Sequence, residues 1–155
     1  MRDKNNQSIQ FSLSEAALNR GLNEATRTPR LIRSLNAKLL ERNFIELNVQ
    51  VGVSALLATS FNVKFELCEC VHDYSRSEIV IKPSDNTIAM ALNMLERFLP
   101  QYEKRDDKYV FNMRRALIRL LSGSRMFGRP LLDVIKITSA ETANNEITIF
   151  AELTD

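Results

Sequence analysis

Three side chains that can bind a soft metal ion follow one another at a spacing of two residues: Cys68, Cys70 and His72. On a β-strand this spacing places them on one face, because side chains alternate between the two faces. Thiolates and imidazoles are ligands that zinc and copper prefer. Successive members would nevertheless lie about 7 Å apart at a rise of ~3.3 Å per residue, so a tetrahedral ion would require the strand to bend. We therefore expect no metal and no other cofactor, and keep the three residues as a weak candidate site.

The same two cysteines bear on the compartment in which the protein works. A disulfide between near neighbours is strained, so Cys68 and Cys70 are expected to be free thiols, which suits a reducing environment. The segment Met1–Gln7 lacks the apolar core of a secretory signal, and no stretch of the chain is apolar for long enough to span a membrane. We expect a soluble, cytoplasmic protein with no membrane partner.

A segment rich in arginine and free of acidic residues lies in the second half of the chain, between residues 112 and 129. Its arginines are Arg114, Arg115, Arg119, Arg125 and Arg129. Such a cluster can bind the phosphates of a nucleic acid, and the glycines and hydroxyls of Ser122–Arg129 can hold a small phosphorylated ligand. A solvated helix face gives the same pattern, and the net charge of +2 points to no partner.

Arg114 differs from its neighbours in its expected position on a helix. At about 100° per residue it falls inside the apolar arc, whereas Arg115 and Arg119 fall opposite. A cation in that position extends to solvent along its aliphatic stem, pairs with a buried acid, or contacts a partner molecule. The sequence leaves these three alternatives open.

Two other segments favour contact with another protein. Ile9 and Phe11 alternate with polar residues, which is typical of a strand that can add to a partner's sheet. The expected helix at 85–99 is apolar on more than one side, which indicates burial under the following helix or against another subunit. Within it, Met90 and Met94 are adaptable contact residues. These four residues are the candidate partner interface.

The elements that must position these side chains follow from the period of the apolar residues. We expect a polar tail at residues 1–10 and a single domain at 11–155. Helices are predicted at 14–25, 29–42, 85–99 and 106–121, and strands at 45–53, 61–67, 78–82, 132–138 and 146–153. The order ααβββααββ, with an antiparallel sheet of about five strands and four helices, indicates the α+β class. Glu69 falls among apolar neighbours on its strand, which predicts a bulge or a strand end there.

The motifs of common enzymes are missing: the chain has one histidine and contains no phosphate-binding loop, dinucleotide fingerprint, nucleophile elbow or zinc-protease motif. Whether it is an enzyme stays open, with a non-enzymatic role favoured. The leading hypothesis is a protein–protein interaction or assembly subunit that works as an adaptor or oligomer component. The alternatives are a nucleic-acid-binding module that uses the arginine-rich helix and loop, and an enzyme acting on a small phosphorylated ligand.

Overall fold

The computed structural model describes residues 7–25, 32–52, 58–86, 89, 102–121 and 123–154. This part of the chain is mostly β-strand and is built around one nine-stranded antiparallel sheet. The expectation of an α+β domain with four helices and five strands is therefore wrong. The strands of the sheet are β1 (Ser8–Ser14), β2 (Ile32–Leu39), β3 (Phe44–Gly52), β4 (Ala58–His72), β5 (Ser77–Pro83), β6 (Tyr102–Arg105), β7 (Lys108–Asn112), β10 (Ile135–Ala143) and β11 (Glu146–Leu153).

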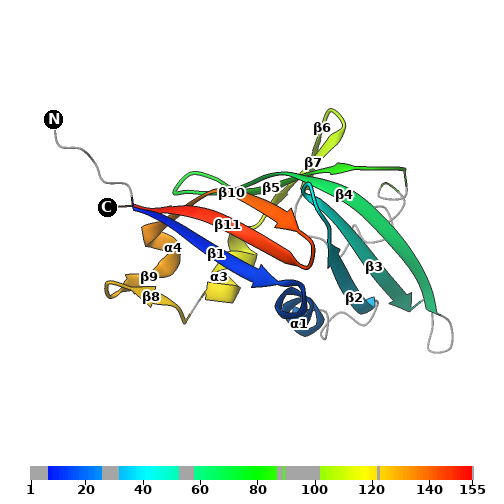
Figure 1. The fold of residues 1–155 in the computed structure, drawn as a ribbon, viewed down its shortest axis with the longest axis horizontal. Coiled ribbons are helices and arrows are strands. Elements are labelled where there is room, and N and C mark those ends of the chain that lie inside the picture. Colours follow the sequence, from blue (N-terminus) through cyan, green and yellow to red (C-terminus); the bar gives the residue numbers. More distant parts are fainter. Residues whose placement is uncertain are drawn as a thin grey trace.

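The sheet branches at its longest strand, β4. Its main path runs β1-β11-β10-β4-β5-β7-β6, and β3 with β2 forms a side branch. Phe65 pairs with β3 on one side and with β5 on the other. His72, at the far end of β4, pairs with β5 and with β10. Strands β3 and β10 therefore share one side of β4, and the sheet opens into two arms there (Figure 1).

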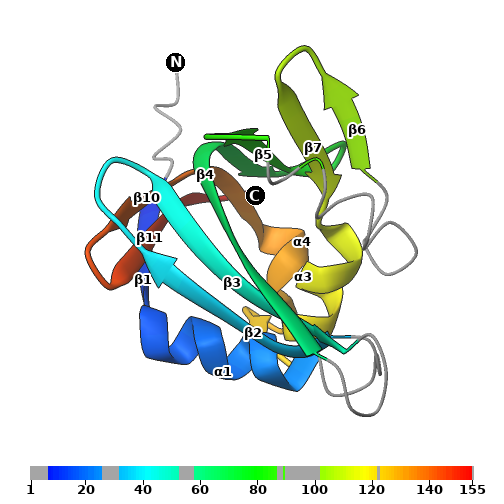
Figure 2. The same ribbon diagram turned by 90° about the vertical axis from the view of Figure 1, so that its right-hand side faces the viewer.

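The remaining elements are short. They are α1 (Glu15–Ala25), α3 (Arg114–Leu121), the helical turn α4 (Leu131–Val134), and the hairpin strands β8 (Arg125–Met126) and β9 (Arg129–Pro130). Figure 2 shows α1 lying along β2, with α3 and α4 inside the curve of the sheet. The core fills this curve: Leu39, Val49 and Val51 are its largest fully buried side chains. Leu22 of α1 and Leu117 of α3 pack against it.

The predicted helix at 29–42 is a strand, β2, over its described part. Leu35 and Leu39 satisfy helical spacing, but Leu35, Ala37 and Leu39 also alternate with polar residues. These three residues pair with β3 in an unbroken register. The hairpin between the strands turns at Arg42 and Asn43, whose φ angles are 59° and 66°, as in the primed turns that fit a twisted hairpin. Pairing with the next strand therefore overrides a local pattern that is ambiguous.

The strands expected at 45–53, 61–67 and 78–82 are present as β3, part of β4, and β5. Glu69 is exposed, and the register of β4 against β5 shifts between Leu67 and Glu69. This β-bulge moves Glu69 off the core face, as its apolar neighbours predicted. The strand expected at 146–153 is present with the same bounds as β11, and the one expected at 132–138 is present as β10, shifted to Ile135–Ala143. The two strands are joined at Asn145, with φ 66°.

Of the four predicted helices, the one at 14–25 is confirmed as α1. The hydroxyl of Ser14 caps this helix by accepting a hydrogen bond from the backbone N–H of Ala17, at 3.2 Å. The helix expected at 106–121 begins only at Arg114, because Asp106 has φ 56° in the turn of the β6–β7 hairpin. The helix expected at 85–99 lies outside the described residues apart from residues 85, 86 and 89.

Candidate functional site

Strand β1 is an edge strand of the large sheet. In the part of the chain that the structure describes, it pairs only with β11, antiparallel and without a register shift from Ser8 to Ser14. Ile9 and Phe11, two of the residues predicted to contact a partner, lie in this strand; Phe11 remains 37% exposed. Residues 8–10, placed in the tail from the sequence, belong to the strand as well. The alternating segment therefore adds to a sheet, and that sheet is the protein's own.

The hydrogen bonds at the two ends of β1 determine which backbone groups face outward. The N–H of Leu153 donates to the carbonyl of Gln7 at 3.1 Å, and the N–H of Glu15 donates to the carbonyl of Asn145 at 2.8 Å. In an antiparallel ladder such bonded pairs recur at every second residue. The odd-numbered residues therefore bond to β11. The N–H and C=O groups of Ser8, Gln10 and Ser12 point to the open edge.

The edge formed by β2 is closed by side chains of α1. The Asn19 side chain donates to the carbonyl of Ala37 at 2.9 Å and accepts from its N–H at 2.6 Å. The carboxylate of Glu15 accepts from the N–H of Leu39 at 2.9 Å. These groups take the place of a neighbouring strand, so this edge cannot accept another chain without losing α1.

The edge formed by β6 is protected by charge and by length. The strand has four residues, and three of them carry charges: Glu103, Lys104 and Arg105. Short, charged edge strands are a common protection against pairing with other chains. By contrast, β1 has seven residues, SIQFSLS, with no charge, proline or glycine. Of these three edges, β1 alone lacks any such protection.

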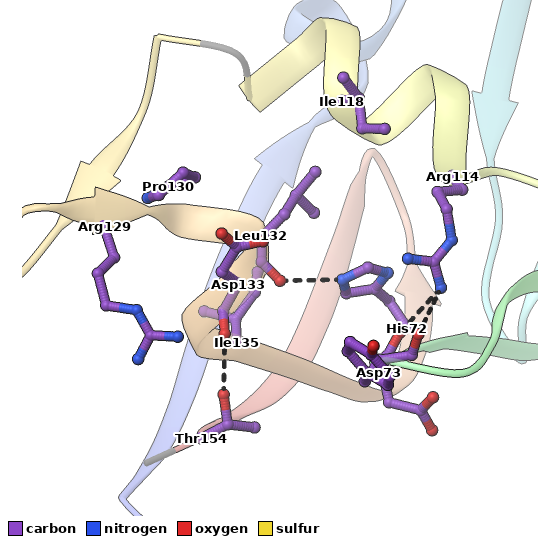
Figure 3. A pocket seen from close by; sticks show the side chains of 11 residues that line it. His72, Asp73, Arg114, Ile118, Arg129, Pro130, Leu132, Asp133, Ile135 and Thr154 are labelled. Atoms are coloured by element: carbon purple, nitrogen blue, oxygen red, sulfur yellow. Dashed lines mark hydrogen bonds between the residues drawn. The ribbon is translucent and has the colours of Figure 1, made fainter.

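A second feature is an open cleft of about 800 Å³ between the β4–β5 turn, α3 and α4. Figure 3 shows its lining residues, which include Arg114 and Ile118 from α3, Arg129 from β9 and Asp133 from α4. The lining mixes cations, acids and apolar groups, so its charge favours no single class of ligand.

His72 lies at the base of this cleft and is held in place by both ring nitrogens. The side chain is 3% exposed. Its Nε2 lies 3.2 Å from the carbonyl of Leu132, and its Nδ1 makes a close hydrogen bond with the hydroxyl of Ser77. Since a carbonyl can only accept, Nε2 carries the proton and Nδ1 accepts from Ser77 in the neutral ring. Nε2 thus joins the β4–β5 hairpin to α4, and Nδ1 is occupied by a bond within the hairpin.

Arg114 makes contacts that the sequence did not suggest, and its contact with a partner molecule stays a prediction. Its guanidinium donates to the backbone carbonyls of Asp73 at 3.1 Å and Tyr74 at 3.2 Å. Among the described residues no acidic side chain forms an ion pair with it. Arg114 thus fastens the β4–β5 turn to the start of α3 (Figure 3).

The other arginines of the cluster are distributed over two elements. Arg115 is exposed on α3, and Arg125 and Arg129 are exposed on the β8–β9 hairpin. The side chain of Arg119 lies outside the described part of the structure, as do Met90 and Met94. The hairpin turns at Phe127 and Gly128, with φ angles of 54° and 76°.

Phe127 at the tip of this hairpin is 82% exposed. A positive φ is uncommon for a bulky residue. Phe127 combines this φ with an aromatic ring exposed to solvent, so packing within the described residues does not explain why a phenylalanine occupies this turn. The arginine pattern of the sequence does not single out this residue. A two-residue turn with positive φ at both positions favours glycine, and Gly128 supplies the second of these positions.

The cysteines do not form a metal site with His72. The β-bulge at residues 67–69 puts Cys68 out of register with Cys70, and within the described residues no three metal-binding side chains converge. Both cysteines are free, as predicted. Burial raises the pKa of the Cys70 thiol to about 11, and burial, followed by the charge of Glu66, raises the pKa of Cys68. Both thiols are therefore poor nucleophiles at neutral pH.

Comparison of the chain with protein-family models, with curated proteins and with solved structures found no match. Within the described part of the chain, every helix is too short or too polar to cross a lipid bilayer.

Proposed function

We propose that the protein is a non-enzymatic interaction or assembly subunit that binds a protein partner by strand addition to β1. The observation that carries this proposal is the contrast between the edges of one sheet. Strand β2 is closed by α1, β6 is short and charged, and β1 is long, regular and uncharged. An extended chain added to such an edge gains main-chain hydrogen bonds and pockets for alternate side chains. The free thiols suit a cytosolic location for this binding.

The open backbone groups of β1 give a substitution that separates binding from folding. The N–H of Ser12 points away from β11, so Ser12→Pro removes a donor from the open edge and leaves the ladder to β11 intact. The matched control is Ser12→Ala, which removes the same hydroxyl and keeps the N–H.

The test compares the wild-type chain and both variants by light scattering and by co-purification with partners from cells. We expect the wild type and Ser12→Ala to form the same complexes, at masses above the 17.7 kDa of one chain. We expect Ser12→Pro to remain folded by circular dichroism and to lose them. If all three proteins give the same complexes, or none gives any, strand addition at β1 is not how the protein works.

As a second candidate function we propose nucleic-acid binding by the β8–β9 hairpin, on the strength of one observation. Phe127 is 82% exposed between two exposed arginines, Arg125 and Arg129. An aromatic ring can stack on an unpaired base while nearby guanidinium groups contact phosphates. Arg114 contributes less to such a surface than the sequence suggested, because it is bonded to the β4–β5 turn.

This candidate is tested by fluorescence anisotropy with labelled single-stranded DNA and RNA at several salt concentrations. Binding should weaken with salt and be reduced several-fold by Phe127→Ala. Tyr74→Ala is the control, because Tyr74 is a fully exposed aromatic residue that lies in the β4–β5 turn and not in the β8–β9 hairpin. No binding at low salt, or equal loss in both variants, would exclude the hairpin as a nucleic-acid site.

A further inference from the structure

We infer that the chain which adds to β1 is a second copy of β1, in an antiparallel pair whose two-fold axis passes at Phe11. This inference rests on the proposed function and names its partner. A two-fold axis perpendicular to the strands makes them antiparallel, and it places the same surface of both copies in contact, so that surface must be complementary to itself. The sequence SIQFSLS and its outward backbone groups meet that condition.

The first requirement is a matched set of backbone hydrogen bonds. Gln10 and Ser12 both point their N–H and C=O groups to the open edge. With the axis at Phe11, Gln10 lies opposite Ser12 of the second copy, and Ser12 lies opposite Gln10. Each of these pairs exchanges two hydrogen bonds, as bonded pairs in an antiparallel ladder do. Ser8 and Ser14 face each other in the same way at the ends, where the N–H of Ser14 can donate to the carbonyl of Ser8.

The second requirement is a match of side chains on the core face. In this register Phe11 faces Phe11 of the second copy, and Ile9 faces Leu13. These are non-hydrogen-bonded pairs, in which side chains come closest. If the axis passed instead at Gln10, Leu13 would face the polar Gln7. The Phe11-centred register therefore places all three apolar side chains of the strand against apolar partners.

The third argument is the incomplete cover of this edge of the core. The side chains of Ile9, Phe11 and Leu13 share a face with Ala151 of β11, which is buried. Ile9 and Leu13 are half-buried, and Phe11 is 37% exposed. The second copy would supply the missing neighbour, and because β1 carries no charge, pairing with itself brings no like charges together.

The experiment is disulfide trapping in the full-length chain. Directly opposed residues of a non-hydrogen-bonded pair have Cα atoms about 4.5 Å apart, which is within the range of a disulfide. Phe11→Cys should therefore give a covalent dimer under mild oxidation. Gln10→Cys is the matched control: two Gln10 residues lie roughly 8 Å apart in this register, which is too far for a bond. The wild type reports any bond formed by the native thiols.

A second readout does not depend on replacing the aromatic ring. Ile9→Cys and Leu13→Cys, mixed in equal amounts, should form a crossed dimer far more readily than either variant alone. Light scattering of the wild type should give twice the mass of one 17.7 kDa chain, and Ser12→Pro should give the mass of one.

The outcomes separate this inference from the function on which it rests. A Gln10→Cys dimer without a Phe11→Cys dimer overturns the Phe11 register. A wild-type monomer whose binding to a different protein is abolished by Ser12→Pro overturns self-pairing and leaves strand addition standing. A monomer that binds nothing through β1 overturns both.

Discussion

The side-chain amide of Asn19 is bonded to both backbone groups of Ala37, at 2.9 Å and 2.6 Å. Asn19, a residue of α1, thus supplies to β2 the hydrogen bonds that a neighbouring strand would supply. The arrangement closes one edge of the sheet while β1, the strand that leads directly into the same helix, stays open. The difference between these two edges is the basis for assigning β1 a binding role.

Replacing Asn19 should weaken the fold and open the edge of β2. Asn19→Ala leaves the N–H and C=O of Ala37 without their partners, and each stranded group costs about 1–3 kcal/mol when buried. Because both bonds are only part-buried, so that water can reach the freed groups, and because alanine favours the helix, we expect a net loss of about 1–2 kcal/mol in the free energy of unfolding, measured by urea denaturation. Arg20→Ala, at an exposed site on the same helix, should stay within ~0.5 kcal/mol of wild type. Equal values for the two variants would show that the edge is not closed by Asn19.

Arg114 should contribute to stability where its neighbour does not. Arg114→Ala removes donors to the carbonyls of Asp73 and Tyr74; because the site is partly open to solvent, we expect a loss of about 1–2 kcal/mol. Arg115→Ala should cost no more than ~0.5 kcal/mol, as at other surface sites. Arg114→Lys should fall between them, because a lysine ammonium keeps the charge and the donors but sits on a shorter side chain than Nη2, the one nitrogen that reaches both carbonyls. Denaturation curves of the three variants that coincide would remove any role for Arg114 in holding the turn.

Cys70 should make the folded state less stable at alkaline pH. Its pKa is raised from 9.0 to about 11 by burial, so folding retains a proton that the unfolded chain releases. The stabilisation that this retained proton gives the folded state is complete below pH 9. It is lost as the pH rises from 9 through 11, at about 1.4 kcal/mol per pH unit. Between those values the free energy of unfolding of the wild type should fall by about 2–3 kcal/mol more than that of Cys70→Ala. Parallel pH profiles for the two proteins would contradict burial of the thiol.

The part of the fold that could be predicted is the part fixed by local pattern. The alternation in β3 and the apolar neighbours of Glu69 predicted a strand and a bulge, and both are present. In β2 the spacing of Leu35 and Leu39 fits a helix as well as a strand. Only pairing with β3 and the bonds from α1 decide between them. That information lies outside β2, in the next strand and in α1.

The candidate site could be predicted only in part, for the same reason. The sequence selected Ile9 and Phe11 as contact residues, but whether a strand is an edge depends on the order of the whole sheet. Likewise, Arg114 was identified as unusual, yet its partners are two carbonyls some 40 residues away. No periodicity in the helix itself could reveal them.

The most direct measurement is amide hydrogen exchange along β1, residue by residue, at low and high protein concentration and with any captured partner. The amides of Ile9, Phe11 and Leu13 bond to β11 and should be protected throughout. Those of Gln10 and Ser12 should exchange fast at low concentration and become protected when the complex forms, because strand addition satisfies them. Gln10 and Ser12 amides that stay equally fast in every complex would contradict the assignment of β1 as the binding edge.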